Sequence, residues 1–131
     1  MTIRLLSVSD PGTLRRDRPP KGVPSKGDVV VVSSVLRNRV PQFGAPKGAV
    51  VGGDYAVLTV VSKYIASVNV RVTLPGGTLR VSGRENGKKT SGTLPVVGGT
   101  GRFAGARGTS YIRNVDKSST RAVNVYRLRI P

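Results

Sequence analysis

The strictest alternation of apolar and polar residues along the chain runs from Ala66 to Leu74. Its even-numbered positions are Ala, Val, Val, Val and Leu, and its odd-numbered positions are Ser, Asn, Arg and Thr. A period of two places successive side chains on opposite faces of an extended strand. This segment is therefore predicted to be a β-strand with one apolar face.

Short valine-rich stretches extend this prediction over the rest of the chain. Residues 28–36 contain four consecutive valines, as expected of a strand that is apolar on both faces. Residues 57–68 also fit a helical spacing, but their β-branched side chains favour strands. About eight strands are predicted, at residues 2–8, 28–36, 49–62, 65–74, 78–83, 93–97, 107–115 and 121–130.

Turn-forming sequences separate these strands. The Asp-Pro-Gly sequence at 10–12 ends the first strand, and the Asn-Gly pair within 85–88 is typical of a tight hairpin, with Glu85 interpreted as a hairpin residue. Residues 13–27 are basic and proline-rich and predict a flexible loop. With 131 residues, the chain is expected to form a single all-β domain, residues 1–131, as a barrel or meander.

Composition excludes several kinds of chemistry. The chain has no cysteine and no histidine, so thiolate chemistry and the commonest transition-metal ligand are missing. Only six residues are acidic, so a metal site is not expected. No stretch approaches the roughly 20 apolar residues that span a bilayer. The expected location is cytoplasmic, or secreted with the signal peptide absent from this chain.

The formal net charge of +16 would attract polyanions. However, the 22 Lys and Arg residues are spread along the whole chain, and aromatic residues make up only 5% of it. A single-strand binder would interleave its basic groups with stacking aromatics. The composition therefore favours a solvated basic surface over a nucleic-acid site, and a non-catalytic module for polyanions stays as an alternative.

The most specific motif lies at residues 94–108, Leu-Pro-Val-Val-Gly-Gly-Thr-Gly-Arg-Phe-Ala-Gly-Ala-Arg-Gly. Glycines at this density indicate positive φ or close backbone approach. The segment predicts a strand, a tight corner and a second strand that begins at Arg107. It resembles the signature of allene oxide cyclase-like and dirigent-like barrels, and so do shorter matches at 27–28, 43–44 and 73–79.

The resemblance, to the bacterial branch of that group, covers roughly residues 27–130. It implies an eight-stranded antiparallel barrel, commonly a trimer, with an apolar cavity open at one end. Members bind hydrophobic small molecules there and guide cyclisation or coupling without a cofactor. The lack of cysteine argues against allene oxide cyclase activity itself, and Arg102 after the glycine motif argues against phenoxy-radical coupling.

The predicted function follows from the barrel, whose interior holds one small ligand. We expect an isomerase- or cyclase-type enzyme of natural-product biosynthesis that directs a hydrophobic, anionic intermediate into one reactive conformer. Its partners would be that small molecule and further copies of the chain, as a trimer or dimer. A hydrophobic ligand carrier without catalysis is another alternative.

The arginine of the Ala-Arg-Gly sequence, Arg107, is the first candidate catalytic residue, because the resemblance implies that it lines the pocket. Its charge would anchor an anion. Arg107 could equally close the glycine corner by bonding backbone carbonyls. Strand alternation puts Thr109, Tyr111 and Arg113 on the same face, with Tyr111 a catalytic candidate and the other two substrate contacts.

Asp10, at the end of the first predicted strand, is the remaining catalytic candidate, by resemblance to a pocket aspartate. An Asp-Pro-Gly turn nevertheless favours bonds from this carboxylate to its own backbone. Further candidate substrate contacts are Asn69, Arg71, Phe103 and Tyr126. Arg71 could also lie outside the barrel, and Tyr126 in a subunit interface.

Overall fold

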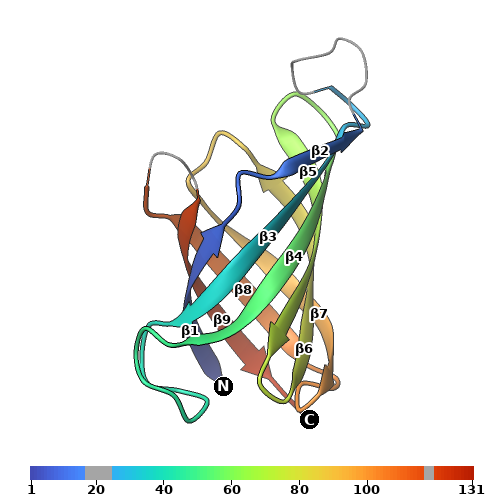
Figure 1. Ribbon diagram of the computed structural model, residues 1–131. Helices are drawn as coiled ribbons and strands as arrows, with labels where there is room; N and C mark the ends of the chain where they lie inside the picture. Colours follow the sequence, from blue (N-terminus) through green and yellow to red (C-terminus); the bar gives the residue numbers. More distant parts are fainter. Residues whose placement is uncertain (17–24, 117–119) are drawn as a thin grey trace.

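The computed structural model describes residues 1–16, 25–116 and 120–131 of the chain (Figure 1). Within these ranges the chain forms strands and no helix, so no helix there could cross a membrane. The strands are β1 (Thr2–Ser9), β2 (Thr13–Arg16), β3 (Val29–Asn38), β4 (Val50–Val60), β5 (Ile65–Leu74), β6 (Gly77–Asn86), β7 (Ser91–Gly101), β8 (Arg107–Asn114) and β9 (Arg121–Arg129).

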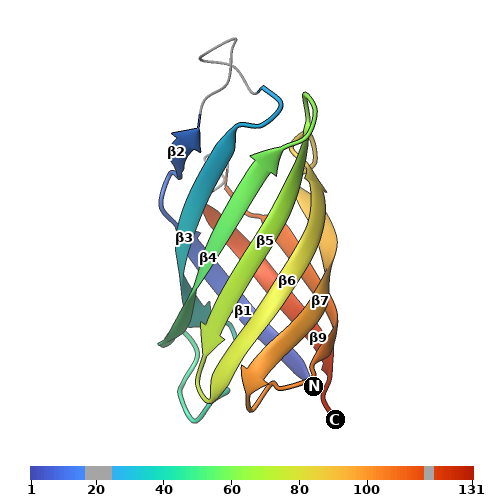
Figure 2. The same cartoon turned by 90° about the vertical axis from the view of Figure 1, so that its right-hand side faces the viewer.

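All strands except β2 form a closed antiparallel barrel, which confirms the predicted eight-stranded fold. Each strand from β3 to β9 pairs with the next, and β1 pairs with both β9 and β3 to close the ring. Figure 2 shows β3, β4, β5 and β6 side by side along one wall. The turns β4–β5 and β6–β7 lie at one end, here termed the open end, and both chain termini lie at the other, the closed end (Figure 1).

The short strand β2 corrects part of the predicted loop at 13–27. The pairing of β1 with β3 stops at Ser9 and Ser34, which leaves the first residues of β3 without a partner on that side. β2 fills this edge, with Thr13 opposite Val31. Residues 17–24 of the predicted loop lie outside the described residues.

Strand alternation determines which side chains fill the barrel. On β5 the apolar even positions point inward, and Val68, Val72 and Leu74 are buried. Directly paired residues of an antiparallel sheet share a face, so this parity carries from strand to strand. Large apolar side chains pack the closed end, among them Ile3, Leu5, Leu36, Leu79, Phe103 and Leu128.

The glycine-rich motif closes this end. β7 runs through the glycines to Gly101, so the turn falls at residues 102–106, and β8 begins at Arg107 as predicted. Gly101 has a φ of 59°, and a Cβ there would collide with the carbonyl oxygen of Gly76. Only glycine fits this position, which lets the β7–β8 turn fold against the β5–β6 turn.

The wall is interrupted between β6 and β7 toward the open end. Their ladder ends at the pair Val81 and Val96. Beyond it, residues 82–86 pair with β5, and residues 91–95 pair with β8. Pro95 has no N–H to donate at the point where the two strands separate.

Candidate functional site

The half of the barrel toward the open end contains a cavity of about 250 Å³. Valine, leucine, isoleucine and alanine from β3 to β9 make up half of the lining residues, and the lining surface is mainly apolar. The other half of the lining residues carry polar groups, among them Ser34, Asp54, Glu85, Ser110, Asn124 and Tyr126. An apolar cavity with a few convergent polar groups is the usual form of a small-molecule site.

Asp54 is one of the two acidic residues that line this cavity. It lies on β4, where Asp54, Ala56 and Leu58 share the inward face. Burial raises the pKa of Asp54 from its usual 3.8 to about 6, and a hydrogen bond with Ser34 partly opposes that rise. Desolvation disfavours the charged form of a carboxyl group. Asp54 can therefore exchange a proton near neutral pH.

Hydroxyl groups continue from Asp54 across two further strands. Ser34 on β3 is paired directly with Asp54, and Ser9 on β1 is paired directly with Ser34. The two serine Oγ atoms are 2.8 Å apart and share a hydrogen bond. This row fixes the carboxyl group against one side of the cavity.

Tyr126, on β9, brings a phenol to the same cavity. Burial raises the pKa of Tyr126, and the negative charge of Asp54 raises it further, while a hydrogen bond with Ser110 on β8 opposes both. The phenol therefore stays protonated near neutral pH and can donate a hydrogen bond. Of the residues predicted from the sequence, Tyr126 is the one that lines the cavity.

Glu85 lies near the end of β6, where it lines the rim of the cavity. The residue is exposed as a whole, yet partial burial of its carboxyl group raises its pKa. The sequence interpretation of Glu85 as a hairpin residue misses this role. On β6 the buried Val81 points inward, and position 85 lies on the same face of the strand. The cavity thus holds two carboxyl groups that retain protons more readily than usual.

The predicted face of β8 lies outside the barrel, which corrects the sequence analysis. Ser110, Ile112 and Asn114 line the cavity, so the odd positions point away from it. Thr109 and Arg113 are exposed, and Tyr111 is half-buried on the same outer side. The four residues do share one face, as predicted, but strand parity alone does not say which face is inside.

Arg107 is exposed at the start of this outer face. Its Nη1 donates a hydrogen bond to the carbonyl oxygen of Ala106 at 2.8 Å. This contact corresponds to the backbone-bonding alternative that the sequence left open. No arginine or lysine side chain lies among the described residues that line the cavity.

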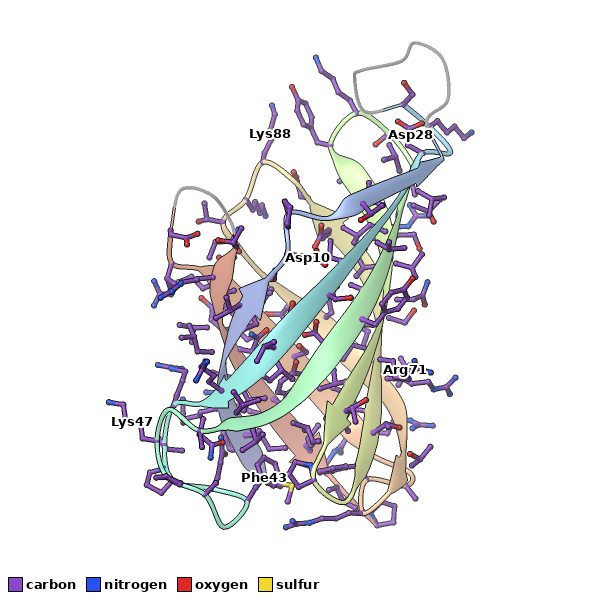
Figure 3. The ribbon with its side chains drawn as sticks, in the orientation of Figure 1. Asp10, Asp28, Phe43, Lys47, Arg71 and Lys88 are labelled. Atoms are coloured by element: carbon purple, nitrogen blue, oxygen red, sulfur yellow. The ribbon has the colours of Figure 1, made fainter. Side chains whose placement is uncertain are left out.

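Asp10 serves the β1–β2 turn. Its Oδ1 accepts a hydrogen bond from the backbone N–H of Gly12 at 2.9 Å, and the N–H of Ser33 lies 3.4 Å away. The side chain is exposed at the corner between the strands (Figure 3). Asp10 thus lies outside the cavity wall.

The remaining candidates also lie away from the cavity. Asn69 is exposed on the outer face of β5 and accepts a hydrogen bond from Ser82 at 2.9 Å. Arg71, on the same face, points away from the barrel (Figure 3). Phe103 is fully buried in the packed core at the closed end.

Asp54 is not among the candidate residues predicted from the sequence. The available signal was a lone acidic residue inside an otherwise apolar predicted strand, residues 49–62. Burial of a carboxyl group in a strand has an unfavourable desolvation free energy. An acidic residue in that position therefore indicates a functional role.

The fold and this lumen define the class of closed antiparallel barrels with an internal cavity. Residues 13–130 match the family of dirigent-like proteins, and the chain belongs to that family. Among curated proteins, no sequence matches this chain.

Several solved structures share the fold at low sequence identity. A pyocyanin demethylase is 18% identical, with 98% of this chain and 100% of that one covered, at a TM-score of 0.75. The Diels-Alderase AbmU from Streptomyces koyangensis is 14% identical, with 100% and 69% covered and a TM-score of 0.72. A pterocarpan synthase dirigent protein is 19% identical, with 98% and 80% covered and a TM-score of 0.70.

Proposed function

We propose that the chain is an enzyme that binds a mainly apolar small molecule in the barrel lumen and directs its cyclisation or isomerisation, with Asp54 as the proton donor. The observation that carries this proposal is a carboxyl group of pKa about 6 that faces an apolar cavity beside a neutral phenol. Perturbed carboxyl groups in such cavities are typical of general acids and bases.

The proposed mechanism needs only this chain's own residues. The apolar wall selects a folded conformer of the substrate and keeps water away from it, which lowers the entropic part of the barrier. Asp54 donates a proton to a carbonyl oxygen of the substrate as the ring closes. The product then transfers this proton back to the Asp54 carboxylate, so no proton is consumed. Tyr126 donates a hydrogen bond to the same developing charge.

The comparisons support this class of reaction. Two of the similar structures are named as Diels-Alderases, and others as pterocarpan synthase dirigent proteins. Because the sequence identities with these proteins are low, the substrate has to be inferred from the residues of this chain. The trimer or dimer implied by the family resemblance is part of the proposal, and sedimentation velocity would measure it.

The experiment uses a reporter reaction, the intramolecular [4+2] cycloaddition of a linear triene that carries an unsaturated ketone. The full chain should accelerate it and change its ratio of diastereomers, measured by chiral chromatography. Ala56→Phe places a ring in the lumen and should abolish both effects. Thr59→Phe is the matched control, because position 59 lies on the outer parity of the same strand.

The outcomes separate the parts of the proposal. Equal loss in Ala56→Phe and Thr59→Phe, with both proteins folded by circular dichroism, would exclude lumenal catalysis. An unchanged diastereomer ratio with the wild-type chain would show that the lumen does not template this reaction class. Asp54→Asn should slow the reaction about 10²-fold, a typical contribution of a general acid, while the ratio stays altered.

One observation favours a second candidate function, polyanion binding on the outer wall. Arg71 lies directly opposite Arg80, and Arg107 lies directly opposite Arg129. Like charges in such positions repel, and the described strands carry no acidic side chain on their outer face to offset them. Heparin-column retention would test it: polyanion binding should weaken steeply between about 50 and 200 mM salt.

A further inference from the structure

A second cavity opens through the barrel wall where β6 and β7 separate. Its volume is about 440 Å³, and its lining includes the cations Arg84 and Lys89. Glu85, Leu94, Ile112 and Asn114 line both this cavity and the lumen. We term it the β6–β7 cleft. A ligand in the lumen could therefore extend into the cleft without crossing a hydrogen-bonded wall.

The interrupted ladder makes the cleft polar. Residues 82–86 and 91–95 each have a strand partner on one side only, so part of their backbone N–H and C=O groups faces the cleft. Backbone groups at such an edge can form hydrogen bonds with a ligand. Thr90, Ser91 and Thr93 also line the cleft.

Leu94 is one of the four residues that line both the cleft and the lumen. Leu94 packs over Gly83, and a Cβ at position 83 would come within 2.9 Å of Leu94 Cδ2. Glycine thus allows Leu94 to lie between the strands, where it contacts both cavities. A leucine side chain can change rotamer to open this boundary, whereas a paired backbone could not.

Charge is divided between the two cavities. The charged side chains of the lumen are the carboxyl groups of Asp54 and Glu85, whereas the cleft adds Arg84 and Lys89. Lys88 lies on the same hairpin (Figure 3), with its Nζ 4.2 Å from the centre of the Tyr64 ring. Glu85 lines both cavities, so the cleft holds one carboxyl group beside the cations Arg84 and Lys89. An anionic group is therefore disfavoured in the lumen and favoured in the cleft.

The volume of the lumen also favours a ligand that extends into the cleft. Small-molecule pockets commonly measure about 300–1,000 Å³, and the lumen cavity of about 250 Å³ lies below that range. A ligand that fills a pocket of that common size would extend beyond the lumen cavity. The adjoining cleft, at about 440 Å³, provides the additional volume.

We propose that the β6–β7 cleft is an anion subsite, in which Arg84 and Lys89 hold a carboxylate, sulfonate or phosphate group of a substrate whose apolar part fills the lumen. The guanidinium of Arg84 can donate two parallel hydrogen bonds to such a group, and the ammonium of Lys89 adds a point charge. The inference rests on the proposed function for the lumenal half of the ligand and adds the chemical class of its other half.

The test compares two fluorescent probes of similar shape, 8-anilinonaphthalene-1-sulfonate and its uncharged parent N-phenyl-1-naphthylamine. The wild-type chain should bind the sulfonate about tenfold more tightly, as expected for charge-assisted bonds of partly exposed groups. Arg84→Ala with Lys89→Ala should remove this preference and leave the affinity for the neutral probe unchanged. Lys47→Ala with Arg71→Ala removes the same net charge from exposed sites outside the cleft and should keep the preference.

Each result has one meaning. Equal affinity of the wild-type chain for both probes, or a preference lost equally in both double variants, would overturn the anion subsite while lumenal binding stands. If the neutral probe does not bind, or Ala56→Phe fails to weaken it, the proposed function of the lumen fails instead. Circular dichroism and thermal melting verify that each variant is folded.

Discussion

The carboxyl group of Asp54 and the phenol of Tyr126 reach the same cavity from β4 and β9, and they differ in how they titrate. Burial raises the pKa of Tyr126, and the charge of Asp54 raises it further. Burial also raises the pKa of Asp54, to about 6. Near neutral pH, the phenol is thus a fixed hydrogen-bond donor, and the carboxyl group is the one that exchanges protons.

The buried carboxylate should weaken the fold at high pH. Because the pKa of folded Asp54 lies above its unfolded value of 3.8, the folded state holds the proton more tightly. Stability should fall as pH rises from about 4 to about 6 and stay lower above that. Asp54→Asn should therefore stabilise the chain by about 1–3 kcal/mol at pH 8 and by almost nothing at pH 4, measured by urea unfolding.

Asp10→Asn is the control for this measurement. It removes the same charge from an exposed turn, and Asn keeps the acceptor for Gly12, so its effect should be small at both pH values. If Asp54→Asn destabilises the chain equally at pH 4 and pH 8, Asp54 is not a desolvated carboxyl group.

The same titration should control the reporter reaction. If Asp54 acts as an acid, the rate should rise as pH falls through about 6 and level off below it. Asp54→Asn should flatten this profile. Glu85→Gln is the matched control for the other carboxyl group with a raised pKa, and it should keep the midpoint. A midpoint that disappears in Glu85→Gln and persists in Asp54→Asn would assign the acid to Glu85.

The closed end of the barrel offers a sharp stability test. Gly101→Ala places a Cβ at a φ of 59° and against the carbonyl oxygen of Gly76. The cost should be about 2–4 kcal/mol. Gly92→Ala, on the same strand with no atom within 4 Å of the added Cβ, should change stability by less than about 1 kcal/mol. Equal thermal melting of the two variants would contradict the close approach.

Much of the fold could be predicted from the sequence because its strands are locally encoded. The alternation from Ala66 to Leu74 predicts a strand with one apolar face, and the family resemblance rests on the glycine motif. β2 was not predicted, because its four residues form a strand by pairing with the part of β3 that β1 leaves unpaired. That edge of β3 exists only in the folded barrel. Pairing partners far apart in sequence leave no local pattern.

The site was harder to predict, for a related reason. On β8 both faces carry polar side chains, so the sequence predicts a shared face for Arg107 and Tyr111 without saying which side it is on. Its position is fixed by the pairing of Ser110 with Tyr126, which belongs to the tertiary structure. Asp54 was overlooked because burial, not residue type, makes its carboxyl group unusual.

Arg107→Ala tests whether this arginine acts in the lumen or only on the wall. Arg107 is exposed, and it lies directly opposite Arg129, so its removal should relieve repulsion. We expect a gain of about 0.2–1 kcal/mol in unfolding free energy at low salt, which should vanish at high salt. The charge-conserving Arg107→Lys should show no such gain. Affinity for N-phenyl-1-naphthylamine should stay within about twofold of wild type, since this side chain lies outside the cavity wall. If Arg107→Ala remains folded but no longer binds the neutral probe, the guanidinium of Arg107 belongs to the ligand site.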